Sequence, residues 1–220
     1  MCSGCISIVL ILLATSLFVW FCSDDKTEAD RSVPEYSQKA PNDGGEGLPE
    51  EGYYAEESVE PVEYPSLRLG GMEWTTANMG DEIEGSYCYD DAPSCENTGR
   101  LYKWYAAMRA CGTGWHLPSV EEFERLKNAL GNEPGRKLKA TETWESDSGS
   151  DTYGFSMYAT GLRDETGDYL MKGENAYFWT STEVDGVRAF YWSLSDTKND
   201  FVRGSDRKSV ALSVRCVKDQ

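Results

Sequence analysis

The sequence has a single histidine, and it has only 21 lysines and arginines against 38 aspartates and glutamates in 220 residues. The formal net charge is therefore −17. An acidic surface repels the phosphate backbone of nucleic acids, so we expect no nucleic-acid partner. Beyond residue 22 there is also no CxxC pair. With one histidine, this gives little support for zinc, and we expect no metal and no cofactor.

The motifs of common catalytic sites are absent as well. The sequence contains no G-x-S-x-G, no H-E-x-x-H and no phosphate-binding glycine loop. His116 lies between Trp115 and Leu117, immediately before an expected helix. We interpret it as a hydrogen-bonded structural residue; the alternative is a general base, whose partner the sequence does not place. We therefore expect that the protein is not an enzyme, with an unrecognised catalytic site as the alternative.

Cysteines are present in two sets. Three lie in or beside an apolar N-terminal segment, and four lie in the globular part: Cys88, Cys95, Cys111 and Cys216. An even number is what a disulfide framework requires. The short separation of Cys88 and Cys95 suits a local bridge. A bridge between Cys111 and Cys216 would close a ring of about 106 residues, worth roughly 4–5 kcal/mol in the chain-entropy model. Two disulfides imply an oxidising compartment.

The longest apolar run is residues 6–22, which are uncharged. As a helix it would be roughly 25 Å long, slightly less than a ~30 Å hydrocarbon core. We favour an uncleaved anchor in the cell membrane. A lipoprotein signal with lipid on Cys22 is an alternative, although Trp20 and Phe21 are bulky where small residues are wanted. A cleaved signal peptide for secretion is another, although no Lys or Arg precedes the run. All three place the rest of the chain outside the cytoplasm, in the cell envelope or beyond it.

Residues 23–65 differ from both neighbours in composition. They contain five prolines, a Gly-Gly pair and little aliphatic content, and residues 24–65 carry a net charge of −10. Such a segment cannot bury enough apolar surface to offset its chain entropy. The sequence thus predicts three parts: a signal or anchor segment (1–22), a disordered acidic linker (23–65) and a globular domain (66–218).

Helix and strand signals follow one another in the globular part. Residues 66–79 indicate a β-hairpin with a Gly70-Gly71 turn. Apolar residues at three- and four-residue spacing predict a helix over 101–110, and Ser119 with Glu122 forms a capping box for a second helix that ends at Gly131. Short strands are expected afterwards, at 152–158, 176–182, 187–194, 201–203 and 210–217. Two helices followed by many strands argue for an α+β fold.

Several motifs in a fixed order resemble one known family. They are Ser86-Tyr-Cys-Tyr-Asp90, Cys95-Glu-Asn-Thr-Gly-Arg-Leu-Tyr-Lys-Trp-Tyr-Ala-Ala-Met108, Ala110-Cys-Gly-Thr-Gly-Trp-His-Leu-Pro-Ser119, Tyr153-Gly-Phe-Ser156, Gly161-Leu-Arg163, Phe178-Trp-Thr-Ser-Thr-Glu183 and Ser213-Val-Arg-Cys-Val217. Over residues 66–218 the chain resembles the Fibrobacter succinogenes major paralogous domain, a family of bacterial surface and secreted proteins.

The resemblance implies a fold and no settled function. The family is similar to the C-type lectin-like fold, in which two helices pack on an irregular antiparallel sheet. The last cysteine of that fold commonly bridges back toward the first helix region, which agrees with Cys111–Cys216. Sulfatase-modifying relatives are oxidoreductases that use free cysteines. All four cysteines of this domain have a disulfide interpretation, which leaves no thiol for such chemistry.

Calcium-dependent sugar binding is the function that a lectin-like fold suggests first. Calcium needs six to eight oxygen ligands. The Glu-Pro-Asn, Gln-Pro-Asp and Trp-Asn-Asp motifs that supply them in lectins are absent. Asp196, Asn199 and Asp200 are candidate binding residues, although such a cluster between strands is usually turn chemistry. Trp192 is a candidate sugar-stacking residue, and the alternative is that it fills the core.

These expectations combine into one functional hypothesis. We expect a non-catalytic, extracytoplasmic binding or adhesion module that contacts protein or polysaccharide through the loops between the late strands. The alternative is a structural component of the envelope without a small-molecule ligand.

Overall fold

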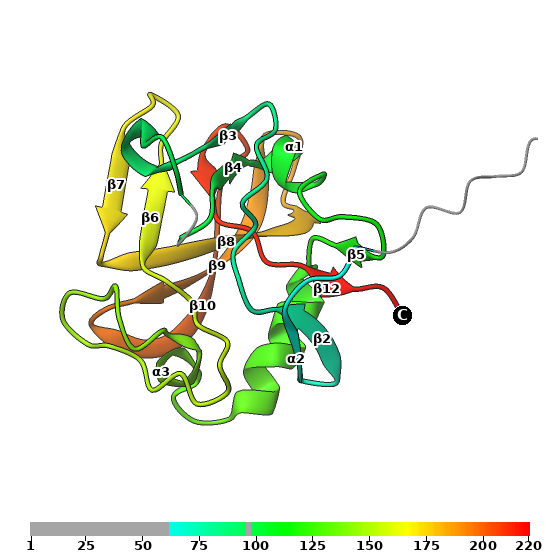
Figure 1. Cartoon of the computed structure of the whole chain (residues 1–220), viewed down its shortest axis with the longest axis vertical. Coiled ribbons are helices and arrows are strands. Elements are labelled where there is room, and N and C mark those ends of the chain that lie inside the picture. The colour runs from blue at the N-terminus through cyan, green and yellow to red at the C-terminus, as the bar shows by residue number, and fades with distance from the viewer. Residues whose placement is uncertain (1–61, 96–97) are drawn as a thin grey trace, which may run out of the picture. The chain divides into compact units, whose positions relative to one another are not determined.

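The computed structural model describes residues 62–95 and 98–220, and within these ranges the fold is mostly β (Figure 1). Twelve strands form two sheets. They are β1 (Ser66–Leu69), β2 (Met72–Thr75), β3 (Ser86–Tyr87), β4 (Leu101–Lys103), β5 (Trp115–His116), β6 (Thr160–Arg163), β7 (Tyr169–Lys172), β8 (Asn175–Glu183), β9 (Arg188–Ser195), β10 (Lys198–Arg207), β11 (Ala211–Leu212) and β12 (Val217–Lys218). The helices are short: η1 (Tyr89–Asp91), α1 (Trp104–Ala107), α2 (Val120–Leu130) and α3 (Pro134–Leu138).

The smaller sheet has the order β1-β2-β12-β5. Its first two strands form the predicted hairpin, with both turn glycines at positive φ (63° and 81°). A Cβ on Gly70 would lie 3.2 Å from backbone atoms of Arg125 and Leu126. Glycine is therefore needed both for the turn and for close packing of the hairpin tip on α2.

The larger sheet has the order β10-β9-β8-β6-β11-β4-β3, and β7 pairs with β6 beside this path. Strands β8, β9 and β10 form a long antiparallel meander that crosses the middle of Figure 1. The pairing of β6 with β8 is parallel. The β6–β7 hairpin turns at Asp164, whose carboxylate accepts the backbone N–H groups of Thr166, Gly167 and Asp168.

Residues 210–217 join the two sheets, and all of them are buried. Strand β11 pairs with β4 and β6, whereas β12 pairs with β2 and β5. Between these strands, Ser213 donates to the carbonyl of Tyr177 and accepts from the N–H of Trp179. Figure 1 shows this red segment passing from the larger sheet to the smaller one.

Arg215 is fully buried at the centre of this segment. Its guanidinium donates to Asn78 Oδ1 (2.6 Å) and to the carbonyls of Thr75 (2.9 Å), Phe155 (2.9 Å) and Ser156 (2.7 Å). Burial lowers its pKa to about 9, although the charges of nearby acidic groups oppose the shift. The planar fork of an arginine can reach acceptors in several directions, and here it joins three separate segments of the chain.

Two hydrophobic cores lie on opposite sides of the meander. The first contains side chains of β2, α2 and the meander, among them Trp74, Phe123 and Phe178. The second contains side chains of β4, α1 and the C-terminal segment, with Trp179 from the meander. Neighbouring residues of β8 thus enter different cores, as the alternation of a strand requires.

The predicted C-type lectin-like α+β fold with two helices is wrong, because one of those helices is almost entirely missing. Leu101–Lys103 is strand β4, which pairs with β3 and β11, and only one helical turn (α1) follows it. Tyr105 and Met108 of the predicted apolar stripe are exposed. Residues 101–103 form backbone hydrogen bonds with a strand on each side, and this pairing makes them a strand although their apolar side chains have helical spacing.

Two predicted strands also differ from the structure. Residues 152–158 make only one isolated bridge, between Lys139 and Met157, because the Asp151 carboxylate binds the N–H and the hydroxyl of Ser156 and holds that residue at φ 51°. The predicted strand 210–217 is divided into β11 and β12, which belong to different sheets. The capped helix is confirmed as α2, with Ser119 and Glu122 in a capping box and Gly131 at its end.

Both predicted disulfides are confirmed, between Cys88 and Cys95 and between Cys111 and Cys216. The expected anchor (6–22), the lipidation site Cys22 and residues 23–61 of the expected linker lie outside the described residues. Within the described part, no helix is long and apolar enough to span a membrane.

Replacing Arg215 with lysine should lower the free energy of unfolding by about 2–4 kcal/mol. An ammonium group cannot reach all four acceptors, so buried carbonyls lose their donors. The matched control is Arg203→Lys. Arg203 of β10 forms an exposed ion pair with Glu124 of α2, so this change should alter stability by less than about 0.5 kcal/mol. Urea unfolding measures both variants, and equal losses would contradict the central role of Arg215.

The two disulfides should differ in their effect on stability. Replacing Cys111 and Cys216 together with alanine should cost about 4–5 kcal/mol, and the same change at Cys88 and Cys95 only about 2–3 kcal/mol, because the second loop is much shorter. Denaturant unfolding of the two double variants compares them. A larger loss at the short loop would show that the C-terminal bridge does not constrain the chain as described.

Candidate functional site

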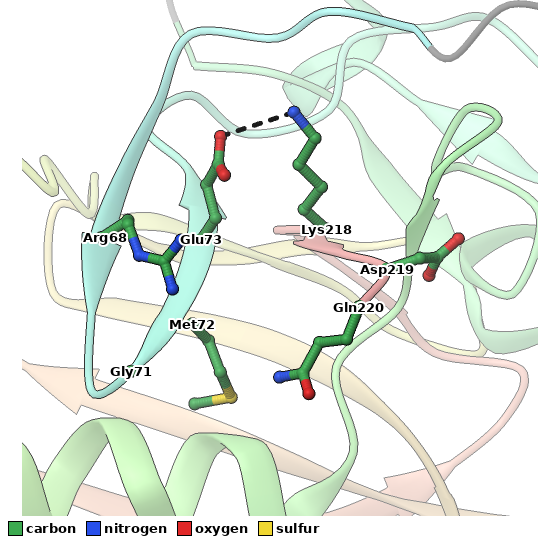
Figure 2. Close-up of a pocket in the computed structure, with 7 residues that line it drawn as sticks. All are labelled: Arg68, Gly71, Met72, Glu73, Lys218, Asp219 and Gln220. Carbon is green, nitrogen blue, oxygen red and sulfur yellow. Dashed lines mark ion pairs between the residues drawn. The ribbon is translucent and has the colours of Figure 1, made fainter.

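A pocket of about 360 Å³ lies between the β1–β2 hairpin and the end of the described chain (Figure 2). It is lined by Arg68, Gly71, Met72, Glu73, Lys218, Asp219 and Gln220. Glu73 lies 3.7 Å from the Lys218 ammonium and accepts a hydrogen bond from Ser66. Glu73 and Lys218 are thus paired within the protein, whereas the Arg68 guanidinium forms no ion pair or hydrogen bond among the described residues and is open to a ligand.

His116 is linked to this pocket through Asp219, whose carboxylate points away from the pocket in Figure 2. Its Nδ1 lies 2.6 Å from Asp219 Oδ1, and its Nε2 lies 3.0 Å from Glu122 Oε1. Partial burial lowers the pKa of the imidazole, but the hydrogen bonds and charges of the two carboxylates raise it by more. The pKa of His116 therefore lies above its usual value. Both ring nitrogens are occupied, which favours a structural role in joining α2 to the C-terminal strand.

A second candidate site lies on the meander, where two tyrosine rings meet at right angles. Tyr177 of β8 and Tyr191 of β9 have ring centroids 5.4 Å apart and an interplanar angle of 86°. A Cβ on Gly204 would lie only 2.4–2.7 Å from atoms of the Tyr191 ring. The ring therefore lies across β10, where any side chain other than glycine would displace it. We call Tyr177, Tyr191 and Gly204 the tyrosine corner; the name refers to these three residues alone and not to the single-tyrosine motif of Greek-key β-sandwiches.

Polar groups surround the tyrosine corner. Asn175 donates to the Tyr177 hydroxyl (2.8 Å), which in turn donates to the sulfur of Met171 (3.0 Å). Among the described residues, nothing hydrogen-bonds the Tyr191 hydroxyl. Burial, together with the charge of Asp206, raises the pKa of Tyr191. Its hydroxyl thus stays protonated at neutral pH and is available to donate a hydrogen bond.

The structure does not bring the four predicted binding residues to one surface. Trp192 is buried in the first core, with its ring centroid 4.8 Å from that of Phe201. Asp196 is buried, and its charge acts on the buried Lys139. The side-chain amide of Asn199 donates to Glu133 (3.1 Å), and Asp200 is exposed. Their role in binding stays a prediction, although burial of Trp192 favours its alternative role in the core.

The tyrosine corner was missed by the sequence analysis. The alternation of residues 176–194 indicates that about half of the aromatic residues face away from the first core. Nothing in the local sequence shows that Gly204 of the next strand leaves room for the Tyr191 ring.

Within the described ranges, no group of three or more His, Cys, Asp or Glu side chains is placed to hold a metal ion.

Stability should depend on His116 as the pH rises above about 6.5. Folding raises the pKa of His116, so the protonated ring stabilises the folded state. This stabilisation is complete below the pKa of the unfolded chain, about 6.5, and is lost as the pH rises through the higher pKa of the folded protein. The ring is partly exposed, so the change should not exceed about 1 kcal/mol. Urea unfolding across this range measures it, and His116→Asn should abolish the dependence, since the chain has no other histidine. Wild-type stability that stays constant or rises with pH would contradict this assignment.

Comparisons with known proteins identify the family. A family model described as the Fibrobacter succinogenes major domain matches residues 67–218, which is more than half of the chain. No curated protein and no solved structure matches the sequence. The match extends from the second residue of β1 to the last residue of β12, and it confirms the resemblance seen in the motifs. The chain belongs to the Fibrobacter succinogenes major domain family.

Proposed function

We propose that this protein is a non-catalytic binding module that works outside the cytoplasm and contacts a surface polysaccharide through the tyrosine corner. Residues 6–22 would attach it to the cell membrane, with secretion as the alternative. The observation that carries the proposal is the pair of perpendicular rings at Tyr177 and Tyr191. The two disulfides support the compartment, since disulfides persist where the environment is oxidising.

The chemistry of the tyrosine corner suits a sugar better than an apolar peptide. The faces of aromatic rings carry partial negative charge and attract the C–H groups of a sugar ring. Tyrosine adds a hydroxyl at little conformational cost. The Tyr191 hydroxyl can pair with a sugar hydroxyl. The Asn175 amide N–H groups already bind Tyr177 and Met171, and Asp206 Oδ1 accepts from the N–H of Arg207, which leaves the Asn175 carbonyl oxygen and Asp206 Oδ2 as acceptors. The centre of a protein interface, by contrast, is usually depleted of charged residues.

Other exposed surfaces support protein binding less well. The large exposed apolar side chains of the described residues are Val62, Tyr105, Met108, Tyr153, Leu170, Met171, Val184, Val187 and Val202. They come from several elements of the fold, with Tyr105 and Met108 at α1, Leu170 and Met171 on β7, and Val184 and Val187 in the turn between β8 and β9. Exposed apolar residues in such small numbers are ordinary on a protein surface and need no partner to cover them.

Replacing Tyr191 with alanine should weaken binding of the full-length chain to its glycan by at least about tenfold, or about 1.4 kcal/mol. A glycan array identifies the ligand, and titration of the purified variant measures the affinity. Tyr153→Ala removes an exposed tyrosine from an irregular segment and is the matched control, expected to bind normally. Tyr191→Phe keeps the ring and separates stacking from hydrogen bonding.

Three outcomes would contradict the proposed function. Unchanged binding by Tyr191→Ala, with its thermal unfolding intact, would remove the tyrosine corner as the contact surface. Retention of peptides but not of glycans would indicate a protein partner. Binding to neither would favour the alternative of a structural envelope component.

A further inference from the structure

A second hollow, of about 410 Å³, lies beside the end of β7, and we call it the side cleft. It is lined by Thr98, Thr143, Glu145, Tyr158, Ala159, Lys172 and Gly173. Its volume lies within the range of small-molecule sites. Four separate segments form its walls, and backbone hydrogen bonds join three of them: the N–H of Glu145 donates to the carbonyl of Gly173, and the N–H of Gly173 donates to the carbonyl of Ala159 (both 2.9 Å). The side cleft is therefore formed before any ligand arrives.

The charged groups of the side cleft form no ion pair with the residues that the structure describes. Among the described residues, the Glu145 carboxylate and the Lys172 ammonium form no ion pair or hydrogen bond, either with each other or with a third group. The Lys172 ammonium lies 4.8 Å from the centroid of the Tyr89 ring. The pocket in Figure 2 differs, because its Glu73 and Lys218 form an ion pair. The Glu145 carboxylate can accept hydrogen bonds from a ligand, and the Lys172 ammonium, which lies over the Tyr89 ring, can still donate them.

The geometry around Glu145 depends on a glycine. A Cβ on Gly173 would lie 2.7 Å from Glu145 Cγ and 2.8 Å from Glu145 Oε1. Gly173 also has φ 86°, which other residues rarely adopt. The glycine therefore leaves the space in which the Glu145 side chain crosses the end of β7.

The opposite wall of the side cleft contains a strained residue. Thr143 has φ 75°, which is unusual for a β-branched side chain. Its hydroxyl accepts a hydrogen bond from the N–H of Ala159 (3.1 Å), which holds this conformation. Residues held in such conformations cluster at ligand-binding and active sites.

Charge and polarity define the class of ligand. Glu145 and the net charge of −17 disfavour an anion, and Lys172 disfavours a cation. Most of the exposed lining of the side cleft is apolar, and the hydroxyls of Thr98 and Tyr158 add groups that can exchange hydrogen bonds with a ligand. An uncharged molecule with many hydroxyl groups and an apolar face meets all these conditions, and the ring of a neutral sugar is such a molecule.

We propose that the side cleft binds one ring of an uncharged sugar. Lys172 lies next to Met171, whose sulfur accepts the hydrogen bond from Tyr177. Strand β7 thus contributes to both the side cleft and the surroundings of the tyrosine corner. This inference rests on the proposed function, because the same polysaccharide would contact both places.

Titration of the full-length chain with neutral monosaccharides, for example glucose, galactose, mannose and xylose, tests the proposal. Binding detected by ligand-observed NMR should be weakened at least tenfold by Glu145→Gln, by Lys172→Met and by Tyr158→Phe. Lys198→Met removes an exposed lysine of β10 and is the matched control, expected to leave binding unchanged. Thermal unfolding of each variant shows whether the fold is intact, and Tyr158→Phe changes the least volume.

The outcomes separate this inference from the proposed function. If a glycan binds through Tyr191 while the variants of the side cleft bind it normally, the side cleft is not a sugar site and the proposed function stands. If no sugar binds in any form, both proposals fail. Stronger binding of glucuronate than of glucose would also overturn the inference, because it would show that the side cleft selects an anion.

Discussion

The buried guanidinium of Arg215 is the interaction on which the described fold depends most. It joins its own C-terminal segment to residues 75–78, at and just beyond the end of β2, and to the irregular segment at 155–156. None of its acceptors is a carboxylate, so the charge is spread over carbonyl and amide oxygens. Burial disfavours the charged form, as the lowered pKa shows. The four hydrogen bonds offset this cost only while all three segments keep their places.

The next residue, Cys216, extends the same constraint. Its disulfide to Cys111 attaches the C-terminal segment to the chain between α1 and β5, and its N–H donates to the hydroxyl of Thr75. Strands β11 and β12 then continue into both sheets. The meander is thereby fixed relative to the smaller sheet, and both candidate binding places lie on elements that this framework supports. A rigid scaffold keeps such places formed in the absence of ligand.

Features set by neighbouring residues could be predicted from the sequence. The capping box at Ser119, the Gly70-Gly71 hairpin and the pairing of the four cysteines each depend on few residues or on a simple count. Residues 101–110 could not be predicted, because apolar residues at helical spacing also suit a strand that leads into one helical turn. Partners distant in the sequence decide between these structures, and their positions are not readable from one segment.

The same reason limited the prediction of binding places. Trp192 and Asp196 stand close together in the sequence, but alternation along β9 and the turn that follows bury both of them. The tyrosine corner requires Gly204 on a neighbouring strand, and the side cleft requires residues from four segments. Periodicity shows which side chains share a face of one strand, whereas a site of this kind depends on how strands are ordered.

The central place of residues 211–218 has a consequence for the order of folding. Until these residues have been synthesised, β2 and β5 lack the strand that joins them, and β4 and β6 lack their common neighbour. These four strands must therefore wait, with open edges, for a segment that follows all of them in the chain. Such long-range pairing is intrinsically slow, and open edges invite wrong partners.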